Sequence, residues 1–437
     1  MTSESQAVPR GRARRFGKFA RLASGVAGSM LAEGVKQVAS GRRPKARDLL
    51  LTPANASRLT QRLAEMRGAA MKLGQIFSMD TGDFLPRELA DILATLRDAA
   101  YTMPDSQLDE VLSDAFGSDY VKKLKHFEQK PFAAASIGQV HRLTTRDGRA
   151  AVLKVQYPGV RESIDSDVDN LATLLRVSGL LPKHMDITPM LAEVKTQLRE
   201  EADYEQEARY LNAFVRALGD DERFLLPRVI PSLSTSRVLG MTYVPGVPIE
   251  DVIHQDQDER DRVWSLLFEL LLVEMFELRL VQTDPNFANY RYDPETGQVI
   301  LLDFGASRRF KAAFTGAYRD LLKATVEGNR AGMVSAAERI GYQLGPAGSP
   351  FYETLLELAE MVLEPLALDA AYDFGNTALP SQLVARGEDI KDYREFWQAP
   401  PVDVAYIHRK LGGLFMLASR LKVSVNVHRL IMPWLDD

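Results

Sequence analysis

The sequence predicts an α+β fold of two lobes, with a small β-rich N-lobe, a helical C-lobe and an N-terminal helical extension. Three observations support this prediction. A helical rhythm of apolar residues runs from Ala56 to Met79, short strand-like stretches follow between 137 and 156, and the chain after Asp251 is almost wholly helical. A chain of 437 residues is also too long for one small core and suits two or three packed units.

The pattern divides the chain into four predicted parts. Residues 1–48 form a basic segment, 49–125 the helical extension, 126–245 the N-lobe with a helical insertion, and 246–437 the C-lobe. The basic segment has apolar residues at helical spacing, which is typical of an amphipathic helix on an anionic membrane surface. A helix packed on its own protein with a solvated basic face fits the same pattern equally well.

Individual elements follow from local signals. Ile137–Arg142 and Ala150–Gln156 flank a turn and predict a hairpin. A continuous helix is expected from Thr188 to Leu218, and a strand from Arg237 to Val244. A second hairpin is expected between Asn289 and Asp303 in the otherwise helical C-lobe.

Composition excludes several classes of protein and site. The formal net charge of -5 argues against a general nucleic-acid binder. The absence of cysteine excludes disulfides, thiolate zinc sites, iron–sulfur clusters and thiol nucleophiles. Because the six histidines are scattered, a catalytic metal is expected on oxygen ligands, which favours magnesium or manganese. The most apolar run, Val263–Leu278, contains three glutamates, so it predicts a core helix and no transmembrane span.

Two motifs of the C-lobe point to phosphate chemistry. The octapeptide QTDPNFAN places Asp284 five residues before Asn289, the spacing that protein kinases use between the catalytic-loop aspartate and a metal-binding asparagine. Asp303 follows in LLDFGAS, where an aspartate that ends a buried strand can hold a metal on nucleotide phosphates. An Asp-Pro turn explains the octapeptide equally well, and Asp-Phe-Gly recurs at 373–375 without a preceding asparagine. The order of all three residues carries the signal.

Two features of the N-lobe complete the pattern. Lys154, in the strand AVLKVQ, can reach the phosphates of a nucleotide if an acidic residue holds it, although a strand lysine is usually a solvated edge residue. The stretch AAASIGQV before it replaces the glycine-rich loop of ordinary kinases and keeps one of its glycines. The candidate nucleotide contacts in this loop are Ala133, Ala134, Ala135, Ser136, Gly138 and Val140.

With these motifs, the chain resembles the AarF/UbiB/ADCK family of atypical kinases. The resemblance rests on MKLGQ at 71–75, the alanine-rich loop, EADYEQEA at 201–208, QTDPNFAN and LLDFGA. The glutamine-threonine start of the catalytic motif is similar to the branch that supports coenzyme Q. The resemblance implies a protein-kinase-like fold whose N-terminal extension covers the place where a protein substrate would bind.

The resemblance also implies residue roles. Lys154 would contact phosphate, Asp284 would be the catalytic-loop aspartate, and Asn289 and Asp303 would bind metal. The hinge that meets adenine would be Met241, Thr242, Tyr243 and Val244. The additions specific to the family would be Lys72, Gly74 and Gln75, with Asp203 as a further regulatory residue.

The partner of Lys154 is left open between Glu201 and Glu207. Six residues correspond to about 120° around a continuous helix, so both should not face the same lysine. We expect one of them to pair with Lys154, and the other, or Asp203, to meet Lys72.

The leading functional hypothesis is an ATPase or small-molecule kinase that uses ATP and Mg²⁺ or Mn²⁺ in support of ubiquinone biosynthesis. ADP, anionic lipid, an isoprenoid-quinone precursor and quinone-biosynthesis proteins are the further partners expected. The alternatives are a nucleotide-gated scaffold or chaperone-like protein and, less favoured, a protein kinase acting in trans. We expect a cytoplasmic protein at the periphery of the inner membrane rather than one of the mitochondrial matrix.

Overall fold

The computed structural model describes residues 68–69, 72, 102–177, 187–390 and 401–436. The chain divides into two compact units. The first comprises Met1–Asn212 and Arg228–Tyr243, and the second comprises Ala213–Pro227 and Val244–Asp437. The basic segment 1–48 and most of the predicted extension lie outside the described residues, so the four-part division remains a prediction.

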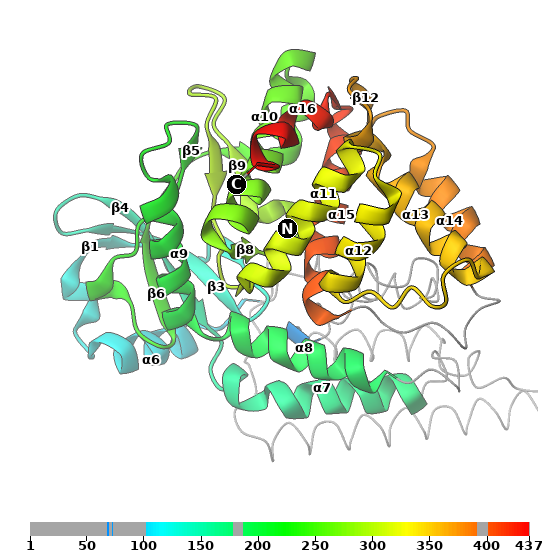
Figure 1. Cartoon of the computed structure of the whole chain (residues 1–437). Helices are drawn as coiled ribbons and strands as arrows, with labels where there is room; N and C mark the ends of the chain where they lie inside the picture. The colour runs from blue at the N-terminus through cyan, green and yellow to red at the C-terminus, as the bar shows by residue number, and fades with distance from the viewer. Residues whose placement is uncertain (1–67, 70–71, 73–101, 178–186, 391–400, 437) are drawn as a thin grey trace, which may run out of the picture. The chain divides into compact units, whose positions relative to one another are not determined.

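An antiparallel sheet forms the frame of the first unit (Figure 1). Its strands are β1 (Leu124–Phe127), β2 (Ala133–Ala134), β3 (Gly138–Thr145), β4 (Ala150–Gln156) and β6 (Val238–Thr242). The order is β1-β3-β4-β6, and β2 pairs with β3. The predicted hairpin is therefore confirmed, and the predicted strand at 237–244 is the shorter β6.

The β3–β4 hairpin follows directly from its sequence. From Val140 onwards, successive residues of β3 alternate between half-buried and buried, as expected for a strand that turns one face to a core. Thr145 accepts and donates backbone hydrogen bonds across the turn, and Gly148 has a φ of 86°. Glycine adopts this left-handed conformation without a steric penalty.

Helix α6 (Asp105–Phe116) packs on this sheet. The helix contributes Leu108, Val111 and Leu112 to a buried apolar cluster, and the strands contribute residues such as Leu153 and Val155. The sheet that carries Lys154 is therefore packed against a hydrophobic core.

The helical insertion consists of α7 (Val160–Val177), α8 (Thr188–Glu201) and α9 (Tyr204–Leu218). Helices α7 and α8 run side by side in Figure 1. The expectation of one continuous helix from Thr188 to Leu218 is wrong, because α8 ends at Glu201 and a separate helix, α9, begins at Tyr204. The carboxylate of Asp203 accepts a hydrogen bond from the backbone amide of Gln206 at 2.9 Å and so caps the start of α9.

The second unit contains several short strands. They are β5 (Phe224–Leu225), β7 (Val247–Pro248), β8 (Leu280–Gln282), β9 (Tyr290–Tyr292), β10 (Val299–Leu301), β11 (Ser307–Arg309), β12 (Tyr372–Asp373) and β13 (Ser424–Val425). One sheet has the order β5-β10-β9-β7, and the pairs β8–β11 and β12–β13 are separate. The β9–β10 pair confirms the hairpin predicted between Asn289 and Asp303, whereas the other short pairs were not expected.

Helices make up most of the second unit, as predicted. They are α10 (Gln257–Leu272), α11 (Ala312–Val326), α12 (Arg330–Ile340), α13 (Pro350–Ala367), α14 (Leu379–Ile390), α15 (Val402–Leu421) and α16 (Val427–Ile431). A π-helical segment, Val273–Leu278, continues α10. Most apolar side chains of this run are buried, which confirms the predicted core helix.

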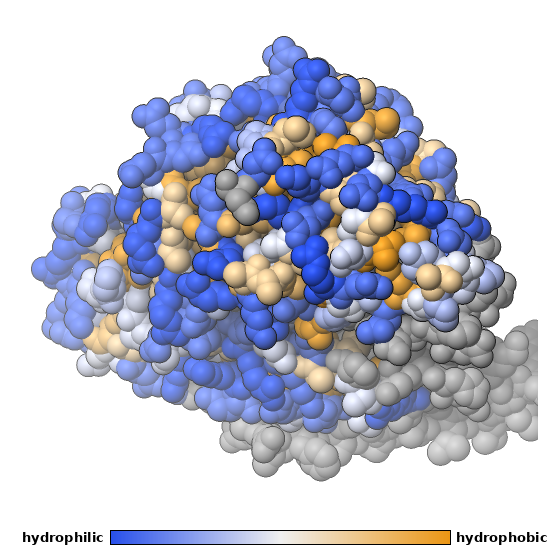
Figure 2. All heavy atoms as spheres, viewed as in Figure 1, coloured by the Kyte–Doolittle hydropathy of each residue, from blue (hydrophilic) through white to orange (hydrophobic). Residues whose placement is uncertain are grey.

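The surface is polar over most of the face drawn in Figure 2, where hydrophobic residues show in small patches between hydrophilic ones. None of the described helices combines the length and the hydropathy that crossing a bilayer requires.

Candidate functional site

Lys154 forms a buried ion pair within the first unit. Its Nζ lies 2.8 and 2.9 Å from the two carboxylate oxygens of Glu207 on α9. Lys154 is 9% exposed and Glu207 is 2% exposed. The Tyr204 ring centroid lies 5.2 Å from the same ammonium, a cation–π contact. A lysine held in this way has a fixed position, so it is not the solvated edge residue that a lone strand lysine usually is.

Glu201 pairs with the other lysine. Its Oε1 lies 2.5 Å from Nζ of Lys72, which is 2% exposed, and its Oε2 accepts a hydrogen bond of 2.5 Å from Ser136. This confirms the predicted division of the two glutamates and settles which one holds Lys154. Asp203 caps α9 instead. Gly74 and Gln75, the other motif residues near Lys72, lie outside the described residues.

The alanine-rich loop is joined to Lys72 through this bridge. Ala133 and Ala134 form β2 and are exposed, and Ala135 donates a backbone hydrogen bond of 2.9 Å to Gly138. A Cβ at Gly138 would lie 2.3 Å from the backbone oxygen of Val155. The retained glycine is therefore required by the close approach of β3 and β4.

A series of buried hydrogen bonds follows the alanine-rich loop at the start of β3. The backbone amide of Met103 donates to Gln139 Oε1 at 2.9 Å, so the side-chain nitrogen of Gln139 donates to His141 Nε2 at 2.8 Å. His141 Nδ1 then donates to the backbone oxygen of Glu128 at 2.9 Å. Burial lowers the pKa of His141, and the neutral ring satisfies both contacts.

The predicted hinge residues lie at the end of β6. Met241 pairs with Val152 on β4, and Thr242 exchanges hydrogen bonds with the backbone of Arg228. Tyr243 donates its backbone amide to Ala150. Val244 begins the second unit, so the predicted hinge spans the point where the chain passes from one unit to the other.

Beside the hinge lies an aromatic and cationic stack that sequence reasoning did not find. The Arg142 guanidinium lies 3.7 Å from the Phe132 ring centroid and 4.8 Å from that of Tyr243. It also donates a hydrogen bond of 2.9 Å to the Tyr243 hydroxyl.

In the second unit, the loop that carries the predicted catalytic residue Asp284 joins β8 to β9. Asn289 Nδ2 donates to Asp284 Oδ2 at 3.0 Å, and Asn289 is 8% exposed. The buried Thr283 donates both its amide and its hydroxyl to the backbone oxygen of Ala306, at 3.1 and 2.7 Å. The loop therefore brings Asp284 and Asn289 together and ties its own start to the segment after Asp303.

Asp303 directly follows β10. Its Oδ1 accepts a hydrogen bond of 2.9 Å from the amide of Gly305, and Phe304 packs on Phe214 with ring centroids 4.8 Å apart. Leu302 donates its amide to the backbone oxygen of Asn289, which links the two predicted metal ligands through the hairpin.

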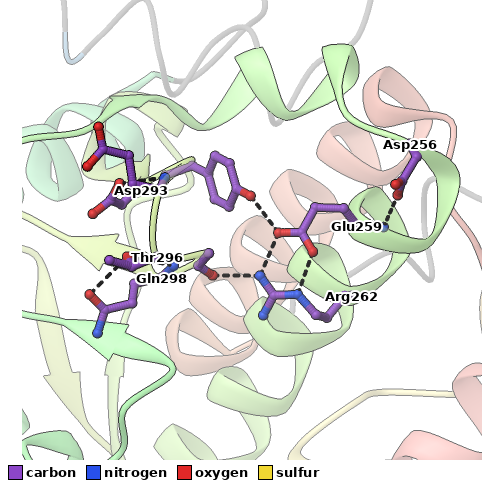
Figure 3. A network of polar contacts seen from close by, with 9 residues as sticks. Asp256, Glu259, Arg262, Asp293, Thr296 and Gln298 are labelled. Atoms are coloured by element: carbon purple, nitrogen blue, oxygen red, sulfur yellow. Dashed lines mark hydrogen bonds and ion pairs between the residues drawn. The ribbon is translucent and has the colours of Figure 1, made fainter.

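A polar network fixes the tip of this hairpin to α10 (Figure 3). Asp256 caps the helix, and Glu259 accepts hydrogen bonds from Arg262 at 2.6 and 2.7 Å. Glu259 also accepts one of 2.6 Å from the Tyr292 hydroxyl, and Arg262 donates to the backbone oxygen of Gly297 at 2.5 Å. The pKa of Glu259 is lowered, chiefly by Arg262.

These donors suit a magnesium site completed by a nucleotide. Mg²⁺ usually takes one or two carboxylates and fills its other positions with water and phosphate oxygens. Because Asn289 Nδ2 donates to Asp284, the asparagine Oδ1 is the atom that can serve as a metal ligand, and Asp303 offers a carboxylate. Across the described part of the chain, no group of three or more His, Asp or Glu residues is placed to hold a metal by itself.

Comparison with known proteins identifies the family. A family model for the ABC1 atypical kinase-like domain matches residues 95–337. The chain belongs to the ABC1 family of atypical kinases. Relatives of this ABC1 protein include Atypical kinase COQ8, mitochondrial, of Saccharomyces cerevisiae, which is 35% identical over 431 residues that cover 98% of this chain and 86% of the yeast protein. The predicted resemblance to the AarF/UbiB/ADCK family is thus confirmed, and family membership makes the chain a kinase-type enzyme.

Two animal relatives give similar values. Atypical kinase COQ8B, mitochondrial, of Rattus norvegicus is 36% identical over 97% of this chain and 80% of the rat protein. Atypical kinase coq-8, mitochondrial, of Caenorhabditis elegans is 36% identical over 97% of this chain, but the chain spans only 57% of the worm protein.

A solved structure agrees with the fold of this ABC1 member. The complex of Rv3197 with erythromycin from Mycobacterium tuberculosis matches with a TM-score of 0.60 at 24% identity, over 88% of this chain and 97% of that protein. This supports the predicted two-lobed kinase-like fold.

Proposed function

We propose that this ABC1 family member binds ATP with a divalent metal and either hydrolyses it or transfers its γ-phosphoryl group to a small or lipid molecule. The observation that carries the proposal is the buried Lys154–Glu207 pair. Burying two charges is costly, and a well-packed apolar pair would serve stability equally well. An ammonium held in place on a strand next to the alanine-rich loop could hold nucleotide phosphates.

The residues of the second unit supply the other roles. Asp284 holds Asn289 through one carboxylate oxygen, and its Oδ1 is the atom that can accept a hydrogen bond from an attacking hydroxyl or water. Asn289 and Asp303 are the residues that would hold the metal. When bound, the metal neutralises charge on the phosphates.

The biological setting is inferred from the relatives. The yeast, worm and rat proteins are named as COQ8-type atypical kinases, and we propose that this chain likewise supports ubiquinone biosynthesis. All three are named as mitochondrial. We therefore favour the mitochondrial matrix over the cytoplasmic location expected from the sequence. Contact with anionic lipid, with a quinone precursor and with quinone-biosynthesis proteins remains part of the proposal.

Release of phosphate from Mg-ATP or Mn-ATP tests the proposal, with and without anionic liposomes. Asp303→Asn should abolish turnover because it removes the carboxylate proposed to bind the metal. The chain offers a matched control in Asp373→Asn, since Asp373 also accepts a hydrogen bond of 2.9 Å from the amide two residues later. That variant should keep the turnover of the unchanged protein.

The outcomes separate the functional classes. Equal loss of turnover in both variants would mean that the loss comes from disrupting this kind of turn rather than from removing a metal ligand. That result would remove the support for Asp303 as a metal ligand. Nucleotide binding without turnover under any condition would favour the scaffold alternative. Transfer of labelled phosphate to an added protein would favour a protein kinase.

A further inference from the structure

A buried polar cluster lies directly behind the catalytic loop of the second unit. It consists of Glu274 in the π-helical segment, Gln282 in β8, Tyr290 in β9 and Lys410 in α15. The four residues are 1%, 4%, 7% and 2% exposed. The catalytic scheme above uses none of them, and their burial requires a physical reason.

The cluster is centred on the ammonium of Lys410. Its Nζ lies 2.6 Å from the Tyr290 hydroxyl, 3.2 Å from Gln282 Oε1 and 3.5 Å from Glu274 Oε2. Tyr290 in turn donates to Gln282 Oε1 at 3.3 Å. An ammonium has three hydrogens, and it meets three acceptors here. Two of those acceptors belong to the strands on either side of the catalytic loop.

Gln282 and Tyr290 are the residues directly before and after the loop that carries Asp284 and Asn289. Helix α15 also contacts the middle of this loop. A Cβ at Gly413, three residues beyond Lys410, would lie 2.4 Å from the Cβ of Pro285. Residues three apart share one helix face, so a single face of α15 reaches both ends of the loop and its centre.

Stability alone does not explain the cluster. Replacing a buried ion pair by apolar residues is often neutral or stabilising, whereas such pairs can select one arrangement among several. Lys410 can act in this way, because its ammonium hydrogen-bonds to Gln282 and Tyr290 at once and so ties the two strands to each other.

We propose that Lys410 is a positioning residue that fixes the geometry of the catalytic loop by joining Gln282 to Tyr290, with Glu274 as its buried counter-charge. The residue acts through the loop and touches no substrate. Measuring this role by turnover assumes the proposed function. Measuring it by the hydrogen exchange of the loop does not.

The test uses a double variant that removes both charges together, Glu274→Gln with Lys410→Met, so that no unpaired charge stays buried. Its matched control is Glu250→Gln with Arg420→Met, which removes another ion pair of the same helix, with its atoms 3.6 Å apart. Arg420 is ten residues from Lys410, about 15 Å along the helix. The measurements are the melting temperature, kcat, KM for ATP and amide hydrogen exchange of the peptide 281–292.

In the first double variant, we expect kcat to fall at least about tenfold while KM for ATP stays within about twofold, because small misplacements of catalytic groups have effects of this size. Exchange in the loop should accelerate by about tenfold or more, while exchange elsewhere is unchanged. The control should match the unchanged protein in all respects. A first variant with unaltered kcat and unaltered loop exchange would overturn the proposal.

Two further arms keep the proposal testable. Tyr290→Phe removes only a hydroxyl, so it serves if the double variant does not fold; lower kcat with faster loop exchange supports the role, and no change in either rejects it. If the unchanged protein shows no turnover, the proposed function fails. In that case the exchange of the loop alone decides the role of Lys410.

Discussion

Glu201 and Glu207 each pair with a buried lysine, but their replacement should affect nucleotide binding differently. We expect Glu207→Gln to weaken binding of Mg-ATP strongly, and Glu201→Gln to leave it nearly unchanged. Glu207 holds Lys154, the proposed phosphate contact, through two hydrogen bonds of 2.8 and 2.9 Å. Glu201 holds Lys72 and Ser136 instead.

The magnitude follows from the burial of the pair. Leaving a buried ammonium without its partner costs about 3–5 kcal/mol of folding free energy. Both variants should lose stability to this extent, since Lys72 is 2% exposed and Lys154 is 9% exposed. The affinity for nucleotide should differ between the two variants. Hydrogen bonds to a charged group contribute about 1.5–3 kcal/mol, so a displaced Lys154 should raise the Kd for ATP by about 10- to 100-fold in Glu207→Gln only.

Calorimetric titration with Mg-ATP, below the melting temperature of each variant, measures this difference. Lys154→Met provides the reference, because combining it with Glu207→Gln should weaken binding no further than Lys154→Met alone. Equal Kd values in the two glutamate variants would refute the division of roles. So would an unchanged Kd in Glu207→Gln.

Three further predictions concern stability. Gly138→Ala should cost about 1–3 kcal/mol in denaturant unfolding, because its Cβ would lie 2.3 Å from the Val155 oxygen. Burial lowers the pKa of His141 below its usual 6.5, so the unfolded chain binds a proton there that the folded protein does not. Thermal melting should therefore show stability falling as the pH drops below about 6.5, and His141→Gln should reduce this fall. Burial raises the pKa of Glu274 from 4.5 to about 7. Below about pH 7 the folded protein therefore holds Glu274 as the protonated acid, and above it as the carboxylate that pairs with Lys410. Stability relative to Glu274→Gln should decline by about 3 kcal/mol as the pH rises from 4.5 to 7 and stay level above it.

Local sequence patterns predicted much of the fold. The β3–β4 hairpin was predicted from two strand-like stretches that flank a turn, and the run from 263 to 278 was predicted as a core helix because glutamates interrupt its apolar residues. Both predictions depend only on neighbours within the same segment. The short strand pairs β8–β11 and β12–β13 carry too few residues to show a period. They form because distant segments pack together.

The site was predicted as far as spacing could specify it. Asp284 and Asn289, five residues apart, are joined by a hydrogen bond. The tripeptide at Asp303 shares its local turn with the one at Asp373, so the turn itself carries no information on function. What distinguishes Asp303 is the hairpin that connects it to Asn289.

Lys410 could not be linked to the catalytic loop from the sequence. It lies 128 residues from Gln282, and no local period connects the two. Its only signal is a lysine on the buried face of an amphipathic helix, where Val404, Ile407, Leu414 and Leu417 are its apolar neighbours. That pattern usually marks a lysine whose stem is buried and whose charge reaches water.

The break between α8 and α9 explains how one short stretch serves two lysines. A continuous helix would fix the angle between Glu201 and Glu207 at about 120° and would make each depend on the other. With Asp203 capping a new helix, each carboxylate takes its direction from its own helix. The pairing of Lys72 can therefore change without moving the partner of Lys154. A change at Lys72 is therefore expected to act on Ser136 and the alanine-rich loop through Glu201, while Lys154, the proposed phosphate contact, keeps its own partner.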